Sequence, residues 1–144
     1  FSDEKIDIGQ MNRVMDLAQH TPSACNRQGW QARIILKQNL IENVLKYQNG
    51  NQGFGNEFKG LILVTGDVRC FNKDRELYQV YIDGGMYCQS ILNALHFENI
   101  ASVPLSASLT SNQEKMIRKI LSINDSEVLL MFIGIGRSPN RINN

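Results

Sequence analysis

Two nearly continuous apolar runs constrain the fold of this chain more than any other feature. One lies at 60–68, around Leu61-Ile62-Leu63-Val64, and the other at 127–135. Each has the length and the β-branched content of a strand, and apolar side chains at nearly every position are typical of a strand that other elements cover. The sequence therefore predicts a sheet that contains two buried strands.

Helical patterns separate these strands. Apolar residues recur at helical spacing in four segments, which span 8–20, 39–48, 74–96 and 111–121. Two weaker extended segments are expected at 32–36 and 101–105. The alternation of the two patterns predicts helices that cover a sheet, and it leaves open whether the strands run parallel or antiparallel.

Local signals mark several points along the helices. Asp7 and Asp74 are candidate N-caps of the first and third helices. The segment Ser111-Asn112-Gln113-Glu114 matches the S-x-x-E capping box at the start of the fourth. Gly84 and Gly85 lie inside the third helix, where two glycines cost about 2 kcal/mol relative to alanine. We therefore expect the close approach of another backbone at this point.

Charge and cysteine usage exclude several classes of function. The chain has 15 Lys and Arg against 14 Asp and Glu, a net charge of +1, and so lacks the basic footprint of a nucleic-acid-binding protein. Its three cysteines have no C-x-x-C spacing and its two histidines lie far apart, so no metal site is expected. Scattered, odd-numbered cysteines fit the cytoplasm, and no apolar run reaches the roughly 18 residues of a membrane span. We expect one domain over residues 1–144.

The segment from Thr21 to Trp30 is the strongest candidate for a binding site. It places hydroxyls, amides, a guanidinium and an indole in one short stretch after a helix end. Such a loop offers many directed hydrogen bonds and one aromatic anchor to a polar, planar ligand with a ribityl or phosphate tail. The alternative is a surface turn in which Ser23 and Asn26 cap the backbone.

The segment Pro22-Ser23-Ala24-Cys25-Asn26-Arg27-Gln28-Gly29-Trp30 resembles the P-S-x-x-N-x-Q-P-W signature of the nitroreductase family of FMN-dependent oxidoreductases, with glycine in place of the second proline. Four weaker matches are collinear with it across nearly the whole chain. They are the opening Phe1-Ser2-Asp3-Glu4, Asp83-Gly84-Gly85 in the central helix, Ala101-Ser102-Val103-Pro104-Leu105-Ser106 beneath the flavin, and Phe132-Ile133-Gly134-Ile135-Gly136 in the last core strand.

The resemblance implies an α+β fold, an α-β-α sandwich whose mainly antiparallel central sheet is covered by helices. It also implies a homodimer with two FMN molecules at the subunit interface. Aromatic residues at helical spacing are usually core or interface, so we expect the helical tyrosines on the dimer surface: Tyr47, Tyr78, Tyr81 and Tyr87. In this family NADH or NADPH delivers a hydride to flavin N5, and the flavin then reduces a small-molecule acceptor, nitro or quinone-like, by a ping-pong mechanism. The flavin supplies the chemistry, so no catalytic side chain is assigned.

The resemblance assigns the flavin contacts to two segments. From one subunit the contacts would come from Pro22, Ser23, Asn26, Arg27 and Gln28. In this set Arg27 would reach the phosphate or the interface, and Gln28 would order the loop. Pro104, Leu105 and Ser106 would lie against the isoalloxazine of the partner's site. There the backbone N–H of Ser106 would donate a hydrogen bond to flavin N5.

The phosphate of the cofactor needs cations, because it carries about two negative charges that arginine pairs best as a bidentate fork. Arg137 and Arg141 are the candidates near the C-terminus, and we prefer Arg141. A further family arginine would lie two residues before Phe1. The few obvious cations keep an alternative open: a flavin-fold protein without activity that serves as a binding or interaction module. A different flavin reaction, such as reductive removal of a substituent, is a third possibility.

Overall fold

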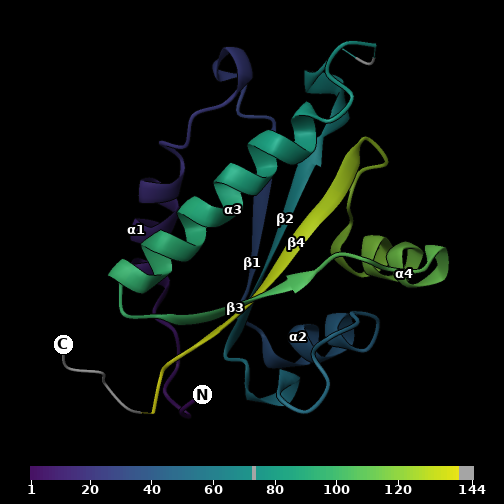
Figure 1. Cartoon of the computed structure of the whole chain (residues 1–144). Helices are drawn as coiled ribbons and strands as arrows, with labels where there is room; N and C mark the ends of the chain where they lie inside the picture. The colour runs from purple at the N-terminus through teal and green to yellow at the C-terminus, as the bar shows by residue number, and fades with distance from the viewer. Residues whose placement is uncertain (73, 140–144) are drawn as a thin grey trace.

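The two apolar runs form the two central strands of a four-stranded sheet (Figure 1). A computed structural model describes residues 1–72 and 74–139. In it the strands β1 (Trp30–Ile35), β2 (Gly60–Asp67), β3 (Ala101–Ser106) and β4 (Glu127–Gly136) are ordered β1-β2-β4-β3. All three pairings are antiparallel. The mainly antiparallel sheet that the resemblance implies is therefore confirmed.

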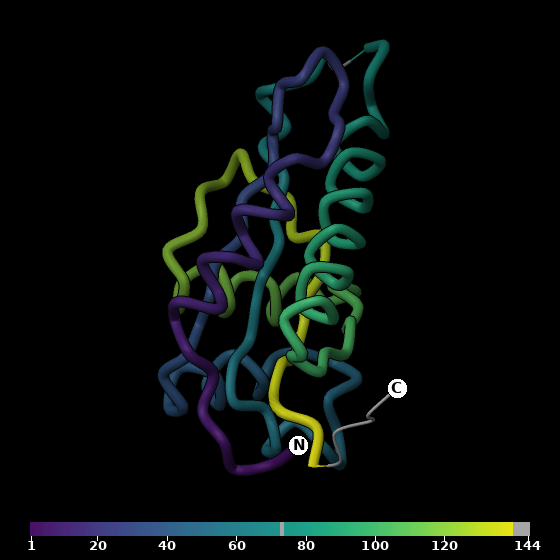
Figure 2. The backbone as a smooth tube through the Cα atoms, turned by 90° about the vertical axis from the view of Figure 1, so that its left-hand side faces the viewer, coloured from purple at the N-terminus to yellow at the C-terminus, as the bar shows by residue number. Residues whose placement is uncertain are grey.

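Helices cover both faces of this sheet. The helices α1 (Ile8–Ala18) and α3 (Gln79–Phe97) pack on one face, and α2 (Gln38–Leu45) and α4 (Ser111–Leu121) lie on the other. Figure 1 shows the two pairs on opposite sides of the strands, and Figure 2 shows α3 running alongside them. The α-β-α arrangement predicted for the chain is confirmed.

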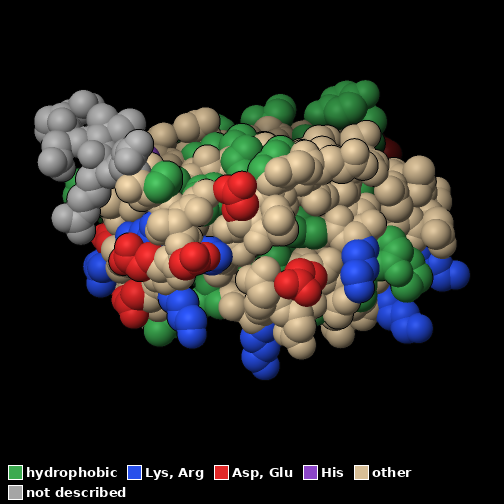
Figure 3. Space-filling view, turned by 90° about the horizontal axis from the view of Figure 1, so that it is seen from below, with side chains coloured by type: hydrophobic (Ala, Val, Ile, Leu, Met, Phe, Trp, Pro, Cys, Tyr) green, Lys and Arg blue, Asp and Glu red, His purple; other side chains and the backbone are tan. Residues whose placement is uncertain are grey.

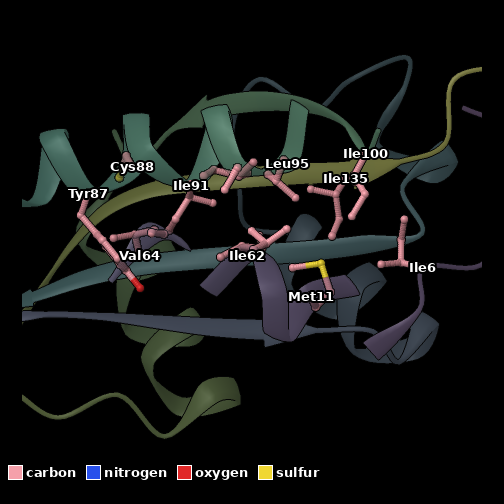
Figure 4. Packing of buried hydrophobic residues seen from close by; sticks show 14 residues of the cluster. Ile6, Met11, Ile62, Val64, Tyr87, Cys88, Ile91, Leu95, Ile100 and Ile135 are labelled. Atoms are coloured by element: carbon pink, nitrogen blue, oxygen red, sulfur yellow. The ribbon is translucent and has the colours of Figure 1, made fainter. Parts of the chain in front are cut away.

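The residues of β2 divide the interior into two cores. Because successive side chains of a strand point to opposite faces, Ile62 and Val64 face α1 and α3, whereas Leu61 and Leu63 face α2 and α4. All four side chains are fully buried. Figure 4 shows Ile91 of α3 pointing down onto the strands of the first core. Burial on both faces explains why this strand is apolar at nearly every position.

The first helix begins as predicted and the third does not. Asp7 is the N-cap of α1, and its carboxylate accepts a hydrogen bond from the backbone N–H of Gln10 at 3.0 Å. The prediction that Asp74 caps α3 is wrong, because this helix begins only at Gln79. The carboxylate of Glu76 accepts a hydrogen bond from the backbone N–H of Asn72 at 2.7 Å and holds the preceding residues in a turn.

The capping box of α4 lies one residue earlier than predicted. Thr110, not Ser111, is the N-cap, and its hydroxyl accepts a hydrogen bond from the backbone N–H of Gln113 at 3.3 Å. The Gln113 side chain accepts one in return from the backbone N–H of Thr110 at 2.8 Å. The Gln113 amide also donates to Asn49 at 2.9 Å, a tertiary contact that favours this residue at the N3 position of the capping box.

The two glycines of α3 meet different surroundings. A Cβ atom on Gly84 would lie 2.1 Å from Cδ1 of Leu130 on β4, so the close neighbour is a side chain and not the backbone we expected. A Cβ atom on Gly85 would meet no heavy atom within 4 Å. Gly84 therefore lets α3 approach the sheet, and Gly85 lies on the outer side of the helix.

The surface mixes charges of both signs. Figure 3 shows Lys and Arg side chains interspersed with Asp and Glu on the lower end of the molecule. Among the helices of residues 1–72 and 74–139, none combines the length and the apolar character that crossing a bilayer requires.

Candidate functional site

The loop that carries the nitroreductase-like signature has an unusual backbone. Cys25, Asn26 and Gln28 have φ angles of 52°, 52° and 50°, in the left-handed region that residues other than glycine seldom adopt. Asparagine tolerates this region, but for Cys25 and Gln28 the conformation is costly without outside support. The contacts around the loop therefore determine its shape.

Two of those contacts come from the loop itself and from the end of α1. The hydroxyl of Ser23 accepts a hydrogen bond from the backbone N–H of Gln28 at 3.0 Å. The Gln28 side chain donates to the carbonyl oxygen of Gln19 at 3.1 Å. This is the capping role that the surface-turn alternative gives Ser23. Pro22 and Asn26 are exposed at the rim of the same turn.

A third contact comes from inside α3. Asp83 is 1% exposed, and its Oδ2 atom accepts a hydrogen bond from the backbone N–H of Ala24 at 3.0 Å. Its Oδ1 atom accepts one from the Gln79 side chain at 2.7 Å. Sequence reasoning did not single out Asp83 as a site residue. The available signal was an acidic residue at helical spacing among Val80 and Tyr87, the buried positions of the helix.

A fourth contact joins Arg27 to the turn before α3. Its guanidinium donates to the Glu76 carboxylate at 2.7 Å and lies 5.8 Å from the centre of the Phe71 ring. The hydrogen bond from Arg27, followed by one from the backbone of Asn72, holds the pKa of Glu76 below its ordinary value. Within the described chain, Arg27 therefore already has an acidic partner.

Tight packing at the end of the loop explains one departure from the family signature. A Cβ atom on Gly29 would lie 3.1 Å from the Phe71 ring and 3.0 Å from Cβ of Cys70, so a larger residue has little room here. The next residue, Trp30, stacks on Tyr87 of α3. Tyr87 is 6% exposed, which corrects its expected place on a dimer surface. Burial raises its pKa above the ordinary value.

The second predicted segment lies at the end of β3. Pro104 and Ser106 are exposed, whereas Leu105 packs into the core between the sheet and α4. The carbonyl oxygen of Ser106 accepts a hydrogen bond from the Gln48 side chain at 2.9 Å. The Ser106 hydroxyl accepts one from the backbone N–H of Ser108 at 3.0 Å. The strand end is thus held in place with its outer edge open.

Arg137 follows β4 and makes several contacts within the chain. Its guanidinium donates to the side chain of Gln10 and to the carbonyl oxygen of Asn99, the latter at 3.2 Å. Its Nε atom lies 3.7 Å from Oε1 of Glu4. The backbone brings Ser2 alongside, since its N–H donates to the carbonyl oxygen of Arg137 at 2.8 Å. Arg141, the preferred phosphate ligand, lies outside the described residues.

The predicted site residues fall into two groups within one chain. Residues 22–28, which we call the loop half-site, lead into β1 at one edge of the sheet. Residues 104–106 and Arg137, the strand half-site, lie on and beside β3 at the opposite edge. Figures 1 and 2 place the loop half-site at the same end as the start of α3, far from the N-terminus. One chain alone does not bring the two half-sites together.

The helix α3 has an exposed apolar face. Its large side chains are Tyr78, Tyr81, Ile82, Met86 and Phe97, which are 38–75% exposed. Gly85 opens the middle of the same face. A hollow of about 330 Å³ between Leu17 and Phe97 borders it. Exposed apolar surface of this extent on one helix is typical of a protein interface.

Among the described residues, the least exposed carboxylate in an ion pair is that of Glu127. Glu127 is 1% exposed and accepts two hydrogen bonds from Arg33, at 2.7 and 2.9 Å. The Thr65 hydroxyl donates to the same carboxylate at 2.5 Å. The hydrogen bonds from Arg33 are the main cause that lowers the pKa of Glu127. These three residues come from three adjacent strands, and nothing in the local sequence marked them.

No metal site emerges from the geometry. Within residues 1–72 and 74–139, no group of three or more His, Cys, Asp and Glu side chains is arranged to hold an ion.

Comparison with solved structures identifies the fold as nitroreductase-like. An FMN-dependent nitroreductase from Clostridium difficile R20291 superposes with a TM-score of 0.83 at 16% identity, covering 98% of this chain and 82% of that one. A nitroreductase family protein from Clostridium difficile 630 gives 0.80 at 20% identity, with 100% and 80% covered. A protein from Staphylococcus epidermidis, provisionally described as an NAD(P)H:FMN oxidoreductase, gives 0.79 at 16%, with 96% and 80% covered.

Comparison of sequences alone finds no relative of this chain. No model of a known protein family matches the chain. No curated protein matches it in sequence either. At identities of 14–20% to solved structures, the likeness establishes the fold.

Proposed function

We propose that this chain is an FMN-dependent oxidoreductase of the nitroreductase type that uses NADH or NADPH and acts as a homodimer. The observation that carries the proposal is the loop half-site. It has the residues of the family signature, it lies in a nitroreductase-like fold, and contacts hold it in a left-handed shape that its own residues disfavour. A loop held in one costly conformation is typical of a binding site.

The donors and acceptors of the two half-sites suit the parts of FMN. The hydroxyl and amide groups of Ser23 and Asn26 match the ribityl hydroxyls and the pyrimidine edge, each of which both donates and accepts. Arg137 supplies a guanidinium for the phosphate. The exposed end of β3 supplies Pro104 as an apolar neighbour of a flat ring and the backbone N–H of Ser106 as a donor. The chemistry of this donor set therefore fits the cofactor.

The division of labour between cofactor and protein follows from that fit. Bound FMN would supply the redox chemistry, which is hydride acceptance at N5 and reduction of a nitro, quinone-like or related acceptor. The chain binds and orients it. A donor at Ser106 would stabilise negative charge that develops on the ring, and Leu105 holds the strand end in place by packing into the core.

The proposed homodimer would complete the site. The half-sites lie at opposite edges of the sheet, so a complete site requires the loop of one subunit to meet the strand of another. The exposed apolar face of α3 provides the surface for such an assembly. Packing two copies through this face would bury Tyr81 and Ile82 and make use of the opening at Gly85.

Flavin binding and reduction test the proposal directly. Purified protein is titrated with FMN while flavin fluorescence and absorbance are recorded, and NADH or NADPH is then added without oxygen. We expect saturable binding, bleaching of the flavin absorbance, and its return on adding a nitroaromatic or a quinone. Asn26→Ala should weaken FMN binding by about tenfold, whereas Asn112→Ala, exposed on α4, should leave it unchanged. A folded protein that takes up no FMN contradicts the proposal.

One observation favours the second candidate, a flavin-fold binding or interaction protein without activity. Arg137 already donates to Gln10 and Asn99 and faces Glu4, so the phosphate would have to compete for it. Stoichiometric FMN that neither NADH nor NADPH bleaches would support this candidate over the enzyme.

A further inference from the structure

Asp83 is a buried acidic residue of α3 whose carboxylate is hydrogen-bonded to the backbone of the loop half-site. Burying a charged group is costly unless hydrogen bonds replace its hydration. Both oxygens of Asp83 are used, one by the backbone N–H of Ala24 at 3.0 Å and one by the Gln79 side chain at 2.7 Å. The only backbone group it contacts in these bonds belongs to the loop half-site. A merely packed helix would place an apolar residue at this position.

The position of that contact within the loop is informative. Ala24 directly precedes Cys25 and Asn26, the first two left-handed residues. The hydrogen bond fixes the peptide group through which the chain enters the disfavoured conformation. Without it, Cys25 would relax toward the ordinary regions of φ/ψ space, because the left-handed region is unfavourable for a residue with a Cβ atom that is neither asparagine nor aspartate. Asp83 therefore acts where the backbone strain begins.

Other contacts of α3 and the turn before it hold the loop further along. Arg27 is paired with Glu76, and Trp30 stacks on Tyr87. These two contacts hold the second part of the loop and the residue that begins β1. Among the side chains of α3, that of Asp83 is the one that hydrogen-bonds to the first part of the loop, at Ala24. Gln79 in turn orients the carboxylate, since its amide donates to the oxygen that Ala24 does not use.

We propose that Asp83 is a positioning residue that holds the loop half-site in its flavin-binding conformation before FMN arrives. This proposal rests on the function proposed above. Preorganisation matters because a loop that populates the competent shape only part of the time binds its ligand more weakly by that fraction.

Hydrogen exchange and FMN titration together test the proposal. In Asp83→Ala, the amides of residues 24–28 should exchange about tenfold faster or more than in wild type, and the Kd for FMN should rise about tenfold. Exchange in α1 and in β2 should stay as in wild type, which separates loss of the loop from loss of the fold. The Tm reports global stability in the same samples.

A conservative variant provides the matched control. In Asp83→Asn the single amide oxygen can take the place of Oδ2 and accept from the backbone N–H of Ala24, and the Gln79 amide can turn over to accept from the new NH₂ group. Loop exchange and FMN affinity should therefore stay within about threefold of wild type. If Asp83→Ala does not fold, Gln79→Ala replaces it, because this residue is the first of α3 and is only partly buried. Gln79→Ala should speed loop exchange and weaken FMN binding in the same direction, by about threefold or more.

The outcomes distinguish the two proposals. Unchanged loop exchange in Asp83→Ala, or in Gln79→Ala if that variant replaces it, overturns the positioning role. Faster exchange with unchanged FMN affinity overturns the claim that the held conformation serves the flavin. A wild-type protein that binds no FMN overturns the proposed function, and the exchange result still decides whether Asp83 holds the loop.

Discussion

Tyr87 of α3 stacks on Trp30 of β1, with ring centroids 4.6 Å apart and ring planes 11° from parallel. The two residues are 57 positions apart in the chain. Trp30 follows the loop half-site and begins β1, and Tyr87 lies one turn beyond Asp83. The stack therefore joins the end of the loop to the helix that also holds its beginning.

Removing this stack should destabilise the protein. Tyr87→Ala should lower the free energy of unfolding by about 3–4 kcal/mol, because it removes a buried ring and its stacked partner. Tyr87→Phe should cost less than about 1 kcal/mol, since the hydroxyl makes only a 4.0 Å contact with the Met15 sulfur. Urea unfolding followed by circular dichroism measures both. Equal losses in the two variants would show that the hydroxyl, not the ring, matters.

The contact between Gly84 and Leu130 predicts that the effect of Gly84→Ala on stability changes sign when Leu130 is truncated. In the wild-type background, Gly84→Ala should destabilise by about 1–2 kcal/mol, because the new methyl group would meet Leu130 Cδ1. In a Leu130→Ala background the same change should stabilise by up to about 1 kcal/mol, since alanine favours the helix. A double-mutant cycle by urea unfolding measures the coupling. Additive effects would exclude the contact as the reason for the glycine.

The buried pair of Arg33 and Glu127 predicts a dependence on pH. The pKa of Glu127 lies below its ordinary value of 4.5 in the folded protein, so the pair contributes its full stability above that value and loses it as the pH falls through the folded pKa. Glu127→Gln should be less stable by about 2–3 kcal/mol at neutral pH. The difference from wild type should shrink below pH 4.5, as measured by urea unfolding across pH. A constant difference would argue against the pair.

The outer face of α3 predicts the state of assembly. Ile82 is 54% exposed in one chain, and Ile82→Glu should convert the proposed homodimer into a monomer because it would bury an unpaired charge. Light scattering after gel filtration gives the mass directly. The control Asn112→Glu adds the same charge to an exposed position of α4 and should leave the mass unchanged. A wild-type monomer at micromolar concentration would refute the dimer.

Short-range patterns predicted most elements of the fold. The strands around Leu63 and Phe132, the cap at Asp7 and the four helices follow from periodicity over a few residues. The start of α3 was missed because Glu76 holds the turn before it through Asn72 and Arg27. The loop half-site was recognised from its residues, but only Asn26 is of a type that favours the left-handed region, and nothing in the sequence marks Cys25 and Gln28 for it.

The sequence by itself determined most of the strands and helices, much of the interior, and where the segment that resembles the nitroreductase signature lies. Only the tertiary structure decided how that signature is held, because Asp83 lies 59 residues from Ala24 in sequence and Glu127 lies 94 residues from Arg33. It also separated the two half-sites to opposite edges of the sheet. Periodicity records whether a side chain is buried, whereas the partner of a buried polar group depends on which distant segments the fold brings together.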